Sequence, residues 1–161
     1  MKLAFLSTAA LLIVLFSSFT HANNERPILG KYNYPGYVLK QHYHATECEI
    51  FASGYMVKTI SRGTPEGEIV STSESMKMEM SAEEIRQLIS LAVNEKTEVT
   101  ENWLCDGPST EMIAYVSKEL SPEGMERLYS TGGCGSPRIR TVGEASKKLF
   151  EMLSLHCPIT H

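Results

Sequence analysis

Residues 76–93 read MKMEMSAEEIRQLISLAV, and along this stretch the periodicity changes from that of a strand to that of a helix. Three methionines alternate with charged residues, which is typical of a strand with one buried face. Ser81 and Glu84 have the spacing of a capping box, in which each side chain satisfies an unpaired amide at a helix start. Apolar residues then recur at helical spacing. The sequence therefore predicts a half-buried strand over 68–80 and a helix over 82–94.

The order strand, Pro-Glu-Gly turn, strand, capping box and helix occurs twice along the chain. Pro65 follows Cys48 by 17 positions, and Pro122 follows Cys105 by the same 17 positions. We therefore expect a diverged duplication of a ββα unit, although turns and caps of this kind are common enough to coincide by chance. The other expected elements are strands over 48–60, 110–118 and 125–131, turns at 64–67 and 121–124, a second capping box at 141–144 and a helix over 145–156.

Two ββα units most simply form an α+β domain, with one four-stranded antiparallel sheet and two helices on one face. This single domain is expected over 47–161, with half-repeats at 47–100 and 101–158. Residues 23–46 contain Pro35 and Gly36, so an irregular aromatic arm with at most one short strand is expected there. The second face of the sheet would be open or covered by this arm. An open face is a candidate binding surface.

Residues 1–22 have the three-part pattern of a secretory signal peptide. Lys2 precedes an apolar run, and Thr20-His21-Ala22 provides a cleavage site. A membrane anchor is the alternative, but a spanning helix needs about 20 apolar residues and serines interrupt this run. We expect a secreted or periplasmic protein that has no membrane span after the signal is removed.

All four cysteines lie beyond the expected signal peptide, and an even number in an oxidising compartment predicts two disulfides. Their spacing contains no Cys-x-x-Cys, which argues against a zinc site. Four cysteines allow three pairings. The hairpin plan places Cys105 near Cys134, which leaves Cys48 to pair with Cys157 and tie the last helix to the first strand. The domain is therefore expected to be disulfide-stapled.

Composition and motifs exclude several classes of function. The chain has 15 basic and 19 acidic residues and a formal charge of −4, so nucleic acid is not an expected partner. It contains no Gly-x-Ser-x-Gly, no His-Glu-x-x-His and no phosphate-binding loop. The sequence therefore favours a binding module over an enzyme. A hydrolase with an unrecognised site around His44, Glu47 and Asp106 is a less favoured alternative.

The leading hypothesis is a small exported binding protein, such as an inhibitor or adaptor that acts on another extracytoplasmic protein, or the binder of a small ligand. Its candidate contact residues are Tyr32, Tyr34, Tyr37 and Tyr43, because tyrosines with one apolar and one polar end are common at interfaces. The alternative is that these tyrosines pack the arm onto the sheet.

The second hypothesis is a copper-handling protein, and no other cofactor is expected. His42 and His44 place two imidazoles on one side of an extended segment, and Met76, Met78 and Met80 place three thioethers on one strand face. Imidazoles and thioethers suit copper ions. The Met-x-Met spacing resembles that of exported copper-handling proteins over five residues. The alternative is that the methionines form a core stripe beneath the first helix.

Overall fold

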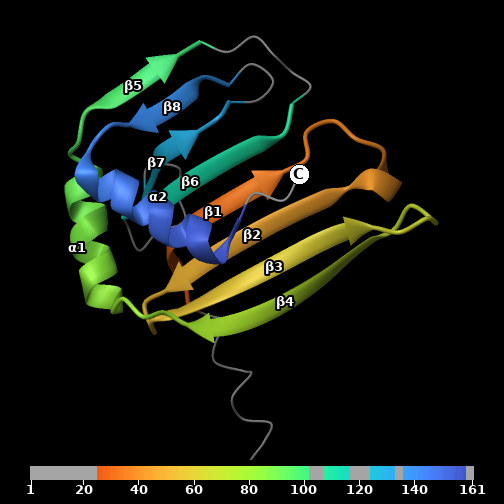
Figure 1. The fold of residues 1–161 in the computed structure, drawn as a ribbon, viewed down its shortest axis with the longest axis horizontal. Coiled ribbons are helices and arrows are strands. Elements are labelled where there is room, and N and C mark those ends of the chain that lie inside the picture. The colour runs from red at the N-terminus through yellow and green to blue at the C-terminus, as the bar shows by residue number, and fades with distance from the viewer. Residues whose placement is uncertain (1–24, 102–106, 117–123, 133–135, 159–161) are drawn as a thin grey trace, which may run out of the picture.

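The computed structural model describes residues 25–101, 107–116, 124–132 and 136–158. Its elements are β1 (Pro27–Tyr34), η2 (Lys40–His42), β2 (His44–Phe51), β3 (Tyr55–Gly63), β4 (Ile69–Lys77), α1 (Ala82–Ala92), β5 (Thr97–Thr100), β6 (Ser109–Tyr115), β7 (Met125–Ser130), β8 (Arg138–Thr141) and α2 (Glu144–His156). The eight strands form one antiparallel sheet in the order β4-β3-β2-β1-β6-β7-β8-β5, and both helices pack on one face (Figure 1). The α+β content is as expected, but the four-stranded sheet predicted from the sequence is wrong.

Strand β1 is the largest departure from the sequence prediction. Residues 23–46 were expected to form an irregular arm, yet β1 lies in the middle of the sheet between β2 and β6. Its side chains on the helix-covered face are Leu29, Lys31 and Asn33, and all three are buried. Because two of these three are polar, the strand lacks the alternation of apolar and polar residues that identifies a half-buried strand.

The remaining extra strands have equally weak signals. The region 48–60 was read as one strand, but Gly54 adopts a φ of 82° and turns the chain between β2 and β3. Strands β5 and β8 have only four residues each and are mostly exposed. Each half of the domain is therefore a three-stranded meander followed by a helix: β2-β3-β4-α1 and β6-β7-β8-α2.

The predicted alignment of the two halves is also wrong. The turn at 64–67 joins β3 to β4, the second and third strands of the first meander. The segment 121–124, predicted as a turn, comes between β6 and β7, the first and second strands of the second meander; residues 121–123 lie outside the described residues. The equal spacing of 17 positions therefore compares turns that do not correspond.

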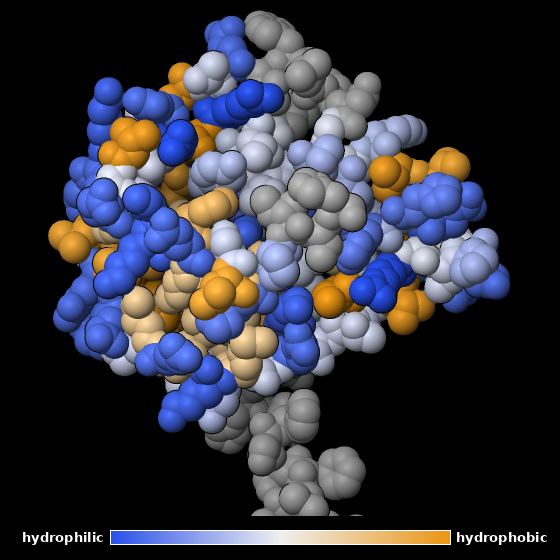
Figure 2. All heavy atoms as spheres, viewed as in Figure 1, coloured by the Kyte–Doolittle hydropathy of each residue, from blue (hydrophilic) through white to orange (hydrophobic). Residues whose placement is uncertain are grey.

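Helix α1 begins as predicted. The hydroxyl of Ser81 accepts a hydrogen bond from the amide of Glu84 at 3.3 Å, and the carboxylate of Glu84 accepts one from the amide of Ser81 at 2.9 Å. The helix buries Ile85, Ile89 and Ala92 in the core that it shares with α2 and the sheet. On the outer surface of this side of the molecule, hydrophilic and hydrophobic residues are interspersed (Figure 2).

Helix α2 begins differently from the prediction, because Thr141 is the last residue of β8 and not a helix cap. The N-cap is Gly143, which has no side chain to offer. Instead, the carboxylate of Glu95 accepts hydrogen bonds from the amides of Ala145 at 2.8 Å and Ser146 at 3.1 Å. A Cβ atom on residue 143 would overlap this carboxylate, which explains the glycine. The carboxylate of Glu95, which follows α1 in the chain, therefore caps the neighbouring helix α2.

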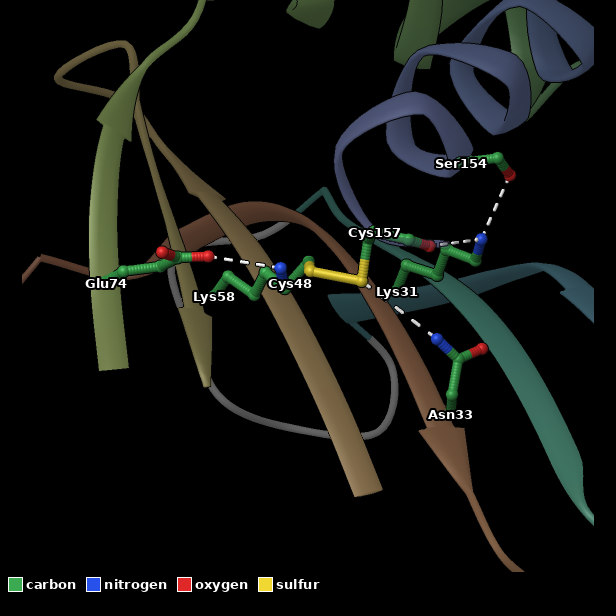
Figure 3. The surroundings of a disulfide bond; sticks show 7 residues. All are labelled: Lys31, Asn33, Cys48, Lys58, Glu74, Ser154 and Cys157. Carbon is green, nitrogen blue, oxygen red and sulfur yellow. Dashed lines mark hydrogen bonds and ion pairs between the residues drawn. A yellow bond between two sulfur atoms is a disulfide. The ribbon is translucent and has the colours of Figure 1, made fainter. Parts of the chain in front are cut away.

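The C-terminus of α2 is fixed to the sheet by a disulfide and by a buried lysine (Figure 3). The disulfide joins Cys48 on β2 to Cys157, which is the pairing expected from the sequence. Lys31 is fully buried, and its ammonium donates hydrogen bonds to the hydroxyl of Ser154 and to the carbonyl of Cys157, each at 2.9 Å. Burial lowers the pKa of Lys31. The other predicted pair, Cys105 and Cys134, lies outside the described residues.

Candidate binding surfaces

The face of the sheet opposite the helices carries a cluster of phenols and carboxylates. Neither α1 nor α2 lies on this face, and η2 approaches it at Gly63, at the end of β3. Tyr32 on β1 lies between Glu47 on β2 and Glu111 on β6, its direct cross-strand partners. The tyrosine–carboxylate cluster, as we call it below, consists of Tyr32, Tyr34, Glu47, Glu49, Glu111 and Tyr115.

Hydrogen bonds hold the cluster in a defined arrangement. The Tyr32 hydroxyl lies 2.8 Å from a carboxylate oxygen of Glu49 and 2.5 Å from the Tyr115 hydroxyl. The Tyr34 hydroxyl donates to Glu47 at 3.4 Å. The rings of Tyr32 and Tyr34 are nearly parallel, with their centroids 6.4 Å apart. Little side-chain freedom therefore remains to be lost when a partner binds.

Gly30 makes room for the central ring of the cluster. A Cβ atom on residue 30 would lie 2.5 Å from the Tyr32 hydroxyl and 2.6 Å from its ring. With hydrogen alone at this position, the ring lies back along β1 and its hydroxyl reaches Glu49. Tyr32 is consequently only 8% exposed, although it is on the face without helices.

The phenols of the cluster act as donors at neutral pH. Burial raises the pKa of Tyr32 above its usual range, and its hydrogen bonds with Tyr115 and Glu49 raise it further. Burial and the neighbouring charge of Glu47 raise the pKa of Tyr34 in the same direction. Because the phenols keep their protons, they can donate hydrogen bonds to the carboxylate oxygens beside them.

The negative charge of the cluster is only partly compensated. Glu111 has an ion pair with Arg127 on β7, at 3.6 Å. Glu47 and Glu49 form no ion pair within the described part of the chain. Two half-exposed carboxylates are therefore available to a cationic group from outside.

Two of the four predicted contact tyrosines belong to the cluster, and two do not. Tyr37 is 91% exposed in the connection between β1 and β2. Tyr43 follows η2 and lies near enough to Tyr34 to influence its pKa. Sequence reasoning missed Tyr115 and the carboxylates as partners of the tyrosines. The alternation in Glu47-Cys48-Glu49 was the available signal, because it places both acids on the face opposite the buried cysteine.

The structure does not bring the proposed copper ligands together. His44 is the cross-strand partner of Arg62 at one end of the sheet. Met76 pairs with Met56, whose partner on β2 is Ile50, six residues from His44. Six residues of a strand span about 20 Å, so these two side chains do not share a site.

The other candidate ligands are also separated. Met78 is buried in the core, and Met76 and Met80 pack against that core. His42 is exposed in η2. Among the described residues, no group of three histidine, cysteine or acidic side chains is placed to hold a metal ion.

The residues of the alternative hydrolase site do not converge either. His44 and Glu47 are three positions apart on β2, so their side chains point to opposite faces of the sheet. Asp106 lies outside the described residues.

A cleft of about 990 Å³ lies on the helix-covered side, between the first half of α2 and strands β7, β8 and β5. Tyr129 and Phe150 form part of its lining, with their ring centroids 4.7 Å apart. Arg138, Arg140 and Lys147 also line it, and none of them has an ion pair within the described residues. Glu98 and Glu144 add two carboxylates to the same lining. The cleft thus combines an aromatic surface with charges of both signs, three positive and two negative.

Helices long and apolar enough to cross a membrane are absent from the described residues. Comparison with known proteins finds no matching protein-family model, no matching curated protein and no matching solved structure. The geometry of the two surfaces is therefore the basis for a functional proposal.

Proposed function

We propose that this chain is a small exported binding protein that holds a cationic segment of another extracytoplasmic protein against the tyrosine–carboxylate cluster. The observation that carries this proposal is the prearranged set of phenols, with two carboxylates that have no ion pair among the described residues, on the sheet face opposite α1 and α2. Export is supported by the signal-like pattern of residues 1–22 and by the disulfide, which is compatible with an oxidising compartment.

Lysine and arginine side chains fit the chemistry of this surface. A guanidinium or ammonium group forms charge-assisted hydrogen bonds with Glu47 and Glu49. Tyr34 is 36% exposed, and its ring can attract both the aliphatic stem and the positive charge of a lysine or arginine side chain. Because these carboxylates are partly accessible to solvent, added salt should weaken the interaction.

A defined peptide tests the surface directly. We would titrate ¹⁵N-labelled protein, produced from Asn23 onward under oxidising conditions, with a peptide of alternating arginine and glycine. Amide shifts should centre on β1, β2 and β6. The double variant Glu47→Gln/Glu49→Gln should bind about tenfold more weakly, because it loses two exposed ion pairs. Equal binding by this variant, or shifts centred elsewhere, would contradict the proposal.

The natural partner is then sought with the same proteins. Wild type and the double variant are immobilised and exposed to envelope and secreted extracts at moderate salt. A matched control, Glu66→Gln/Glu68→Gln, removes the same charge from the exposed end of the β3–β4 hairpin. A partner of this surface is retained by wild type and by the control and is lost by the cluster variant.

The cleft supports a second candidate function, the binding of a small anionic amphiphile. The observation in its favour is the combination of an aromatic lining with three cations, which outnumber the two carboxylates of Glu98 and Glu144, in a volume suited to a small ligand. Titration with dodecanoate should shift the amides of α2 and β8. Arg140→Gln should weaken binding, and Arg62→Gln, on the distant β3, should not. Identical affinities for these two variants would rule out the cleft as the site.

A further inference from the structure

The two edges of the sheet differ in how they are protected. At one edge, β5 has only four residues, and an ion pair joins Lys96 to Glu98; an ion pair also joins Glu74 on β4 to Lys58 on β3, so the difference between the edges is one of length. At the other, β4 has nine residues without a proline, and eight of them are exposed. Proteins usually protect long edges with prolines, charges or bulges, because an open edge pairs readily with another strand. The pairing of β4 with β3 has no bulge.

The hairpin identifies which groups β4 presents to the outside. The amide of Thr64 donates to the carbonyl of Glu68 at 2.8 Å, so these residues form a hydrogen-bonded pair. Hydrogen-bonded and non-hydrogen-bonded pairs alternate along an antiparallel ladder. The odd-numbered residues of β4, from Ile69 to Lys77, are therefore in non-hydrogen-bonded pairs with β3. Their amides and carbonyls point away from β3 to the free edge.

The side chains agree with this assignment. Non-hydrogen-bonded pairs bring side chains closer together than hydrogen-bonded pairs do. The hydroxyls of Thr59 and Ser73 lie 2.8 Å apart, and so do those of Ser61 and Ser71. In the part of the chain that the structure describes, no strand pairs with the outer edge of β4, so Ser71, Ser73 and, by the same alternation, Ser75 offer unpaired backbone groups there.

We propose that two copies of this chain associate through β4, antiparallel and about a twofold axis at Ser73. This joins the two eight-stranded sheets into one continuous sheet. In this register, Ser73 pairs with the partner's Ser73, Ser71 with the partner's Ser75, and Ile69 with the partner's Lys77. The twofold axis repeats the last two of these pairs, so five pairs form. Each pair exchanges two backbone hydrogen bonds, which gives about ten in all.

The sequence of β4 is complementary to itself in this register. Glu74 faces the partner's Thr72 and Lys77 faces the partner's Ile69, so no like charges meet. Val70, which is 52% exposed in the monomer, faces the partner's Met76. An axis at Glu74 would set that residue against the partner's Glu74. The axis at Ser73 is also the one that pairs all nine residues, and a twofold axis closes the assembly at two copies.

Sedimentation and light scattering of the mature chain, from about 1 µM to 1 mM, test the dimer. In Ser73→Pro each copy loses one backbone donor at the interface, whereas no backbone hydrogen bond to β3 is lost because that amide points outward. The hydroxyl contact with Thr59 on β3 is lost in Ser73→Pro and in Ser73→Ala alike, so Ser73→Ala is the matched control. The dimer dissociation constant should rise about thirtyfold. Ser73→Ala keeps the donor and should dimerise like wild type. A wild type that stays monomeric at 1 mM, or a dimer unaffected by Ser73→Pro, would overturn the proposal.

Engineered cysteines test the register. Directly paired residues have Cα atoms about 5.5 Å apart, which a disulfide can span. Ser73→Cys should therefore form an intermolecular disulfide with itself. Ser71→Cys and Ser75→Cys should each remain uncrosslinked alone and should crosslink when mixed. Crosslinking of Ser75→Cys with itself would refute this register. A strand of a different protein bound to β4 in place of the second copy would refute the dimer.

Discussion

Removing the disulfide between Cys48 and Cys157 should destabilise the protein by about 4.8 kcal/mol at 25 °C. This value follows from the sequence separation of 109 residues, because the crosslink restricts a long loop in the unfolded chain. Both cysteines are fully buried, so replacement by alanine adds a smaller packing loss. Typical domains are stable by only about 5–15 kcal/mol. The double variant Cys48→Ala/Cys157→Ala should therefore be marginally folded at room temperature.

Urea unfolding followed by circular dichroism measures this loss. The variant should show a lower midpoint and a steeper dependence on urea, since its unfolded chain exposes more surface without the crosslink. Adding reductant to the variant then reports on Cys105 and Cys134, the second predicted pair. A loss below about 1 kcal/mol with an unchanged slope would refute the argument from loop length.

Three further predictions test other parts of the fold. Because burial lowers the pKa of Lys31, the wild type should gain stability as pH rises from the folded-state pKa to the unfolded-state pKa. Urea unfolding between pH 7 and 11 measures this gain, and Lys31→Met should not show it. Gly30→Ala should cost about 1–3 kcal/mol by displacing the Tyr32 ring, whereas Gly107→Ala, with open space around it, should be nearly neutral in the same assay. Burial raises the pKa of Glu95, but hydrogen bonds from α2 outweigh this effect, and the net pKa is lowered. The wild type should therefore lose stability as pH falls through the folded-state pKa of Glu95. Glu95→Gln should cost about 1 kcal/mol at pH 7 and should flatten the acid limb of a plot of melting temperature against pH.

The parts of the fold that were predicted correctly have local signals. Helix α1 follows from a capping box and a helical repeat within a few turns of chain. Strand β1 has no such signal, because its buried face includes Lys31 and Asn33. The partners that satisfy Lys31 belong to the C-terminus of α2, more than 120 residues away. A sequence pattern cannot show that a lysine will be buried when its acceptors are that distant.

The same reasoning applies to the candidate site. The sequence predicts Tyr32 and Tyr34 as contact residues from their chemistry alone, and that role stays a prediction. Their hydrogen-bond partners lie 17 and 83 residues from Tyr32 and 13 residues from Tyr34, on strands whose register is set by the whole sheet. The carboxylates and Tyr115 could therefore be assigned to the cluster only after the strand order was known.

The central position of β1 has a consequence for the order of folding. β1 pairs with β2 immediately after it and with β6 far along the chain, and the cluster contact between Tyr32 and Tyr115 spans 83 residues. Contacts of this range must pay loop-closure entropy before they stabilise anything, so folding should be slow for a domain of this size. Until β6 arrives, one edge of β1 stays open. A chain interrupted before residue 109 would expose that edge and aggregate more readily than the complete domain.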